Sequence, residues 1–231
     1  MPLPCCVTTV SAELLCGTPL LAVIKRADRP GSPNPAALAQ APDRDRRGGI
    51  WKYRGVEYRE VTANDAEAIA ELHAESWRRH YRGAYLDSFL DGDVVADRMA
   101  EWTGRLSRPA PDRYTVVADL DGAVVGFAHT ILDADPTWGA FLDNLHVRHD
   151  LKRHGIGARL MAETVRAVAR RRPSTGLYLW VLEQNTAAQA FYGAQGGRCV
   201  QRELTGPFPG GGYAFSFRYA WPDLSKLAEH D

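Results

Sequence analysis

The sequence predicts an α/β (α+β) fold, in which strands and helices are mixed along the chain. Residues 55–62 alternate as a strand does, and an amphipathic helical pattern follows them. Two β-branched runs surround Asp121-Gly122, a dipeptide suited to the positive φ angles of a hairpin turn. A third segment, residues 139–147, reads as a strand and leads through two glycines into another helix. These three observations predict a sheet with helices packed on it.

The spacing of apolar residues predicts two helices in the first half of this region. Residues 66–77 carry them three and four apart, and Thr62 or Asn64 is suited to cap the helix. The same spacing predicts a second helix over residues 87–106.

The second half continues in the same way. Residues 177–182 form a short apolar strand, and Asn185 is suited to cap a helix that ends in a Gly-Gly stop. Residues 197–205 and 213–222 read as two further strands, with Cys199 as a packed thiol on the first.

Composition narrows the class of protein. The 231 residues are 45% hydrophobic and carry 28 basic and 28 acidic side chains, so no overall basic field attracts nucleic acid or a membrane. Any anion site must be local. The four cysteines match neither a disulfide framework nor paired zinc ligands, so we expect no metal and a cytoplasmic location.

The first fifty residues differ from the rest. No Lys or Arg precedes Lys25, and Pro19 interrupts the apolar run, which disfavours a signal peptide. The segment that follows is rich in Pro, Gly, Ala and alternating charge. We therefore expect residues 1–50 to be a flexible, disordered tail or linker, and residues 51–231 to form the domain.

The stretch "DLKRHGIGARL" predicts a site for an anion. A helix N-terminus exposes unpaired N–H groups, and glycines let a phosphate approach the backbone. Gly155 and Gly157 open this helix, and basic side chains surround them. A dinucleotide-binding loop would need a third glycine where Leu160 stands, and a P-loop would need Gly-Lys-Ser/Thr, which is missing. An ordinary strand-to-helix turn is the alternative.

Two linked motifs, "KRHGIG" and "LYLWVLEQNTAAQAFYGAQGG", resemble those of the GCN5-related N-acetyltransferase (GNAT) superfamily. Lys152 stands where the family usually has Gln or Arg, and Gly196-Gly197 replaces the usual Gly-Phe. The resemblance implies a central mixed, mostly antiparallel, twisted sheet of six to seven strands flanked by about four helices. It also implies acetyl transfer from acetyl-coenzyme A to an amine.

The resemblance assigns coenzyme contacts. Its loop would hold the pyrophosphate, and the strand before it would bind the pantetheine arm through the backbone. The coenzyme-binding residues implied are Leu145, His146, Val147, Lys152, Arg153, His154, Gly155, Ile156, Gly157, Ala158, Arg159 and Asn185. Two strands that separate after Leu145 would turn free N–H groups toward the thioester and stabilise an oxyanion.

Catalytic and acceptor-binding residues are expected at neighbouring positions. In the family the residue matching Tyr192 protonates the departing thiolate. A general base is needed only for an acceptor amine that is protonated, and Asp143, His146 or a chain of water molecules would serve. Glu75, Trp77 and Tyr81 lie on the first helical segment, where the family covers its acceptor.

Three functions fit these observations. The first is an acyl-coenzyme A-dependent N-acetyltransferase that acts by direct attack on a primary amine of a small molecule or peptide. The second is a non-catalytic acyl-coenzyme A sensor or partner module. The third is a toxin-like acetyltransferase of aminoacyl-tRNA, which the balanced charge disfavours. A homodimer is an expectation from the family.

Overall fold

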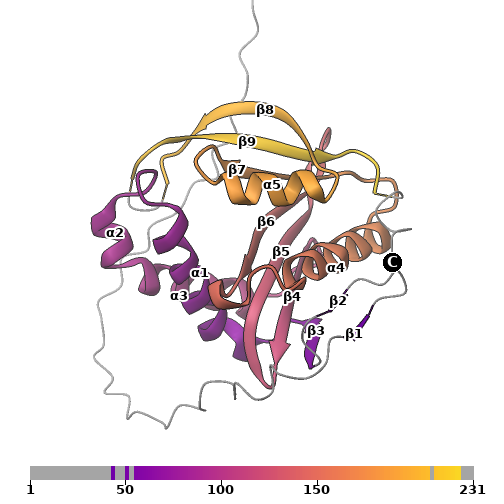
Figure 1. Cartoon of the computed structure of the whole chain (residues 1–231), viewed down its shortest axis with the longest axis horizontal. Coiled ribbons are helices and arrows are strands. Elements are labelled where there is room, and N and C mark those ends of the chain that lie inside the picture. The colour runs from indigo at the N-terminus through magenta and orange to yellow at the C-terminus, as the bar shows by residue number, and fades with distance from the viewer. Residues whose placement is uncertain (1–42, 45–49, 52–54, 209–210, 225–231) are drawn as a thin grey trace, which may run out of the picture. The chain divides into compact units, whose positions relative to one another are not determined.

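The structure is a computed structural model, and it describes residues 43–44, 50–51, 55–208 and 211–224 (Figure 1). The predicted tail, residues 1–50, lies almost entirely outside the described residues. Strand β1 (Asp43–Arg44), near the end of this tail, pairs antiparallel with strand β2 (Ile50–Trp51).

In the part of the chain that the structure describes, seven strands form one sheet in the order β3-β4-β5-β6-β7-β9-β8. All neighbours are antiparallel except β6 and β7, which are parallel. The mixed, mostly antiparallel sheet of the predicted fold is therefore confirmed. The strands are β3 (Val56–Glu60), β4 (Arg113–Leu120), β5 (Ala123–Asp135), β6 (Gly139–Val147), β7 (Leu177–Leu182), β8 (Arg198–Thr205) and β9 (Ala214–Trp221).

Helices cover both faces of the sheet, as Figure 1 shows. Helices α4 and α5 lie against one face, while α1 and α3 pack on the other. The helices are α1 (Ala66–His80), α2 (Asp87–Asp91), α3 (Val94–Ser107), α4 (Ile156–Arg171) and α5 (Thr186–Ala194), with the 3₁₀ turns η2 (Ala63–Asp65) and η3 (His149–Leu151).

The alternation of side chains along the central strands produces one hydrophobic core on each face of the sheet. On β4, Val116 and Ala118 pack toward α4, whereas Val117 between them packs toward α1 and α3. Successive side chains of a strand point to opposite faces, so an almost wholly apolar strand supplies both layers. Asp121 (φ 53°) and Gly122 (φ 84°) make the predicted hairpin turn between β4 and β5.

The start of α1 differs in detail from the prediction. The turn η2 separates β3 from the helix, and the Thr62 backbone N–H donates to Asp65 Oδ2 at 2.7 Å. The Arg59 guanidinium lies 2.8 Å from Asp65 and 2.9 Å from Asp119. These contacts hold the beginning of α1 against the sheet, and α1 supplies one wall of the cavity described below.

Two predictions about local structure are wrong. The single helix expected over residues 87–106 is two helices, because α2 ends at Asp91, just before Gly92, and the chain turns before α3 begins. Cys199 is exposed on β8 rather than packed. Strand β8 is exposed along most of its length, since the described helices cover neither of its faces.

Candidate active site

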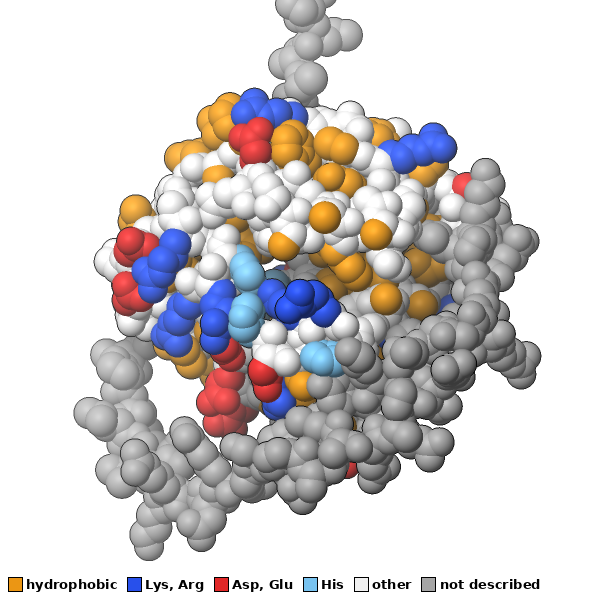
Figure 2. All heavy atoms as spheres, viewed as in Figure 1, with side chains coloured by type: hydrophobic (Ala, Val, Ile, Leu, Met, Phe, Trp, Pro, Cys, Tyr) orange, Lys and Arg blue, Asp and Glu red, His pale blue; other side chains and the backbone are white. Residues whose placement is uncertain are grey.

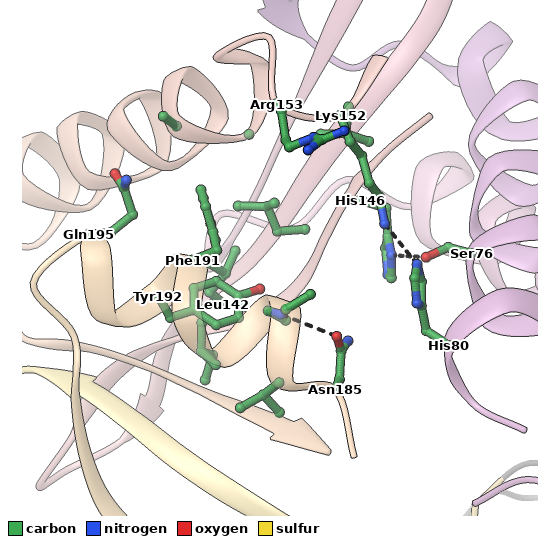
Figure 3. Close-up of a pocket in the computed structure, with 18 of the residues that line it drawn as sticks. Ser76, His80, Leu142, His146, Lys152, Arg153, Asn185, Phe191, Tyr192 and Gln195 are labelled. Carbon is green, nitrogen blue, oxygen red and sulfur yellow. Dashed lines mark hydrogen bonds between the residues drawn. The ribbon is translucent and has the colours of Figure 1, made fainter. Parts of the chain in front are cut away.

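A cavity of about 480 Å³ lies between β6 and β7. In Figure 2 its mouth is a hollow rimmed by Lys, Arg and His side chains. Residues from α1, β6, the turn before α4, β7 and α5 meet there (Figure 3). They are Ser76, His80, Tyr81, Leu142, Asp143, Leu145, His146, Val147, Leu151, Lys152, Arg153, Gly155, Gly157, Ala158, Leu179, Trp180, Val181, Asn185, Ala187, Ala188, Phe191, Tyr192 and Gln195.

The cavity exists because β6 and β7 separate. They pair only at Ala140 with Leu177 and at Phe141 with Tyr178. The strands were predicted to separate after Leu145. They separate after Phe141, four residues earlier. Asp143 explains the difference: His129 of β5 faces Asn144 and Thr130 faces Leu142, so Asp143 is an extra residue in β6. Such a bulge bends a strand away from its neighbour.

The two faces of β6 contribute different side chains to this cavity. Leu145 and Val147 pack with the core on the side of α4 and α5. His146 contacts His73 and Phe127, which belong to the side of α1 and α3. Because residues of both faces line one cavity, the cavity passes through the sheet at the gap.

The turn before α4 has the geometry expected of an anion site. Gly155 precedes the helix with a φ of 85°, and Arg153 also has a positive φ of 64°. At Gly157 an added Cβ would lie 3.6 Å from Phe191 and 3.7 Å from Val147, two residues that line the cavity. The first-turn N–H groups of α4 and the Gly157 backbone therefore border open space.

Three residues that the resemblance placed in the coenzyme site do not line the cavity. Ile156 is 2% exposed and packs in the core. The Arg159 side chain points away, with its Nε donating to Glu163 and its guanidinium over the Tyr58 ring. His154 also lies outside the lining. The stripe predicted for α4 is confirmed, and Ile156 belongs to it.

Helix α5 brings two predicted residues to the cavity. Asn185 caps the helix, because its Oδ1 accepts a hydrogen bond from the Ala188 N–H at 3.2 Å (Figure 3). The Tyr192 side chain is buried, and burial raises the pKa of its hydroxyl. The hydroxyl therefore remains protonated at any pH at which the protein works. The two residues lie on one side of the gap, opposite α1.

His146 meets α1 across the cavity. Its Nδ1 lies 2.8 Å from Ser76 Oγ, within hydrogen-bonding distance. Burial, together with the nearby His80 and Lys152, lowers the pKa of His146 to about 3. The imidazole is therefore neutral at physiological pH.

Asp143 lies on the same face of β6 as His146. The Arg105 guanidinium of α3 donates to its Oδ2 at 2.7 Å, and Asn144 Nδ2 donates to the same oxygen. Glu101 also contacts Arg105, so the group of three carries one net negative charge. Asp143 borders the cavity next to Tyr81. Burial, and after it the charge of Asp143, raises the pKa of the Tyr81 hydroxyl to about 12.

Of the three residues predicted to bind the acceptor, only Tyr81 reaches the cavity. Trp77 is 6% exposed and packs in a core under the α1 to α2 turn, with the Arg98 guanidinium 4.2 Å from its ring centre. Glu75 points to solvent and pairs with Arg79. A helix turns 100° per residue, so Trp77 and Tyr81 share a face only approximately.

Sequence reasoning missed part of the lining. Ser76 and His80 lie four apart on α1 and share the face toward the cavity. Trp180 alternates with two core residues of β7, a signal that the apolar run "LYLWVL" conceals. Phe191 and Gln195 repeat this four-residue spacing on α5. The sequence shows this spacing, but it does not show which elements pack against each face of the two helices.

Within the described part of the chain, no group of three or more His, Cys, Asp or Glu side chains is arranged to hold a metal ion. No helix among the same residues is long and apolar enough to cross a membrane.

The chain belongs to the family described as the acetyltransferase (GNAT) family, whose model matches residues 67–196. It is thus an N-acetyltransferase, a class of enzyme that takes its acetyl group from acetyl-coenzyme A.

Individual relatives agree with this placement. The chain is 26% identical over 175 residues to YuaI, an uncharacterized N-acetyltransferase of Bacillus subtilis, covering 74% of this chain and 96% of that one. The PaiA N-acetyltransferase of Thermoplasma acidophilum, solved with coenzyme A, has a similar fold with a TM-score of 0.59 and 20% identity, covering 73% and 100%. YncA of Salmonella typhimurium, a putative acetyltransferase solved with acetyl-coenzyme A, also has a similar fold, with a TM-score of 0.54 and 16% identity. The match covers 74% of this chain and 95% of that chain.

Proposed function

We propose that this protein transfers the acetyl group of acetyl-coenzyme A to a primary amine of a small molecule or peptide, by direct attack of the amine on the thioester. One observation carries the proposal. A single cavity passes through the sheet where β6 and β7 separate, with a glycine turn on one side and a negatively charged group on the other. Donor and acceptor can therefore meet in the gap.

The coenzyme half of the cavity lies toward α4 and α5, and it consists of Leu145, Val147, Lys152, Arg153, Gly155, Gly157, Ala158, Asn185 and Tyr192. Its turn suits a pyrophosphate, because N–H groups, glycines and two basic side chains converge there. The fold neighbours solved with coenzyme A and acetyl-coenzyme A support this assignment. Asn185 uses its Oδ1 in the helix cap, so only its NH₂ group is available to donate to a ligand.

The acceptor half faces α1 and α3, and it consists of Ser76, Tyr81, Asp143, His146 and Trp180. Tyr81 and Trp180 provide aromatic walls, while the charge of Asp143 favours an approaching ammonium group. This arrangement suits a compact amine or the amine-bearing end of a peptide.

Two groups of the chain stabilise the reaction in this proposal. In the described part of the chain, the edge of β6 that faces β7 has no strand partner beyond Phe141, so backbone N–H groups near Leu145 and Val147 can donate to the developing oxyanion. The Tyr192 hydroxyl gives its proton to the departing thiolate and takes one back from solvent as coenzyme A leaves. The raised pKa of Tyr192 keeps the hydroxyl protonated before the reaction.

The acceptor amine must lose a proton. His146 has a pKa of about 3 and is therefore a weak base, and the Asp143 carboxylate already accepts hydrogen bonds from Arg105 and Asn144. We infer that both side chains orient a water molecule that carries the proton to solvent. Asp143 also stabilises the positive charge on the attacking nitrogen.

Calorimetric titration with acetyl-coenzyme A, beside coenzyme A and NADH, tests the donor. Binding of both coenzyme forms in the micromolar range and no binding of NADH is the expected result. Thiol release with a panel of primary amines then separates the enzyme from a sensor module, which would bind the coenzyme and release no thiol with any amine. A folded protein that binds neither coenzyme form would remove the proposal.

A further inference from the structure

Two walls of the cavity are joined by one polar contact. Lys152 Nζ, from the turn before α4, lies 2.7 Å from Nε2 of His80, the last residue of α1 (Figure 3). Both residues line the cavity. The contact therefore joins the glycine turn to the helix that borders the acceptor half.

The chemistry of the pair defines its protonation state. An ammonium group can only donate, so His80 Nε2 accepts, and the proton of the neutral imidazole stands on Nδ1. Burial lowers the pKa of His80, as do Lys152 and then His149 and Arg79. Burial also lowers the pKa of Lys152. Within the described residues Lys152 has no carboxylate partner, so its charge is held by a weak acceptor.

Among the residues that the structure describes, no group around His80 favours a charged imidazole. Its titratable and charged neighbours are Lys152 in the turn, His149 in η3, Arg79 on α1 and His146 on β6. None of these is an acid. A positive charge on His80 must therefore come with an anion that enters from outside.

We propose that His80 is a second phosphate-binding group of the coenzyme site, outside the glycine turn, and that it becomes charged when a phosphate draws Lys152 away from it. This inference rests on the proposed function. Lys152 then donates to a phosphate oxygen in place of His80 Nε2. His80 takes one proton from solvent onto that nitrogen and donates a hydrogen bond to the phosphate through the new N–H group. This N–H bond is the only covalent bond that forms, and one proton enters with the ligand.

The proposal gives the sign of a pH effect. Proton uptake accompanies coenzyme binding in the pH range that lies between the lowered pKa of His80 in the free protein and its higher pKa in the complex. Affinity therefore falls as pH rises through this window. In wild type we expect binding to be about tenfold tighter at pH 6 than at pH 8.5, because a charge-assisted hydrogen bond is lost.

Calorimetry in two buffers of different ionisation enthalpy measures this uptake directly. Dephospho-coenzyme A is the probe, because it lacks the 3′-phosphate that itself titrates near pH 6. Wild type should take up a fraction of a proton at pH 6.5. The variant His80→Gln should take up none and should bind with nearly the same affinity at pH 6 and 8.5. His149→Gln, at an exposed histidine of the adjacent turn, is the control; it keeps His80, so it should still take up protons and bind more tightly at pH 6 than at pH 8.5.

A second measurement follows His80 itself. Imidazole NMR should show the Nδ1–H tautomer and a low pKa in the free protein, and an upward shift of that pKa with dephospho-coenzyme A. Pantetheine, which has no phosphate, should leave it unchanged. Probe binding with the same His80 titration, or with equal proton uptake in His80→Gln, overturns the inference and leaves the proposed function standing. If folded wild type binds neither dephospho-coenzyme A nor acetyl-coenzyme A, both are overturned.

Discussion

The coenzyme half and the acceptor half of the cavity are built in different ways. The turn that begins the coenzyme half is a continuous segment, and it offers backbone N–H groups, glycines and two basic side chains. The acceptor half takes single side chains from α1, β6 and β7. Each of these depends on a neighbour: Arg105 holds Asp143, Ser76 meets His146, and Arg218 lies 4.7 Å from the Trp180 ring centre.

In the proposed function, this difference combines a fixed site for the donor with an adaptable site for the acceptor. A backbone cradle does not change when side chains are substituted, apart from the glycines. A site made of supported side chains changes with every substitution in it or behind it. Variants should therefore separate the two halves.

The largest effect is expected at Gly157. In Gly157→Leu the side chain would extend past Phe191 and Val147 into the space proposed for the coenzyme, and acetyl-coenzyme A affinity should fall by about 100-fold or more. Calorimetric titration measures this loss. Gly104→Leu on α3 is the control, because an added Cβ there meets nothing within 4 Å. Unchanged affinity in Gly157→Leu would remove the cradle.

Tyr192→Phe should lower kcat by about 100-fold, since a positioned proton donor contributes on that order. The affinity for acetyl-coenzyme A should change little, because the ring remains. Steady-state rates compared with calorimetric affinities separate the two effects. Tyr178→Phe on β7 removes another buried hydroxyl, from a ring stacked on Phe141 and outside the cavity, and should retain wild-type turnover. Equal rates in both variants would contradict the acid role.

Asp143→Asn should raise KM for the amine by about tenfold, because it removes the negative charge that favours an ammonium group. Coenzyme affinity should remain as in wild type, since the residue belongs to the acceptor half. Steady-state kinetics with an amine found by the panel measure the change. Asp133→Asn, at an exposed ion pair with Arg172, is the control. An equal loss of coenzyme affinity would show that the halves are not independent.

The smallest effect concerns acid stability on the face of α1 and α3. Burial lowers the pKa of His129 to about 3, while the unfolded chain has about 6.5. The unfolded state thus binds the extra proton, and stability falls as pH decreases from 6.5 toward 3. This histidine accounts for about 0.7 kcal/mol between pH 7 and 6. Urea unfolding should show a shallower pH slope for His129→Gln than for wild type and for the exposed-site variant His149→Gln.

The predictability of the two halves follows from their construction. The motif "KRHGIG", the cap at Asn185 and the position of Tyr192 could be predicted from the sequence, because consecutive residues determine each of them. The sheet followed from alternation and from the resemblance. Trp77 and Tyr81 could not be told apart, because whether an aromatic on α1 faces the core or the cavity depends on elements far away in sequence.

The position of the gap could not be predicted for a related reason. A bulge depends on the match between two strands, and nothing in "GAFLDNLHV" alone indicates that Asp143 has no partner on β5. His80 was visible as a titratable residue, but its contact with Lys152 joins residues 72 positions apart.

The extra residue in β6 has a consequence for how the chain can change. Without Asp143, β6 would match β5 residue for residue from Gly126 to Ile131, lose this bend and continue to pair with β7, so that the gap would close. Replacing its side chain should only retune the enzyme, whereas deleting the residue should abolish the place where the reaction occurs. At this point the length of the polypeptide, rather than the identity of any amino acid, determines that the cavity exists.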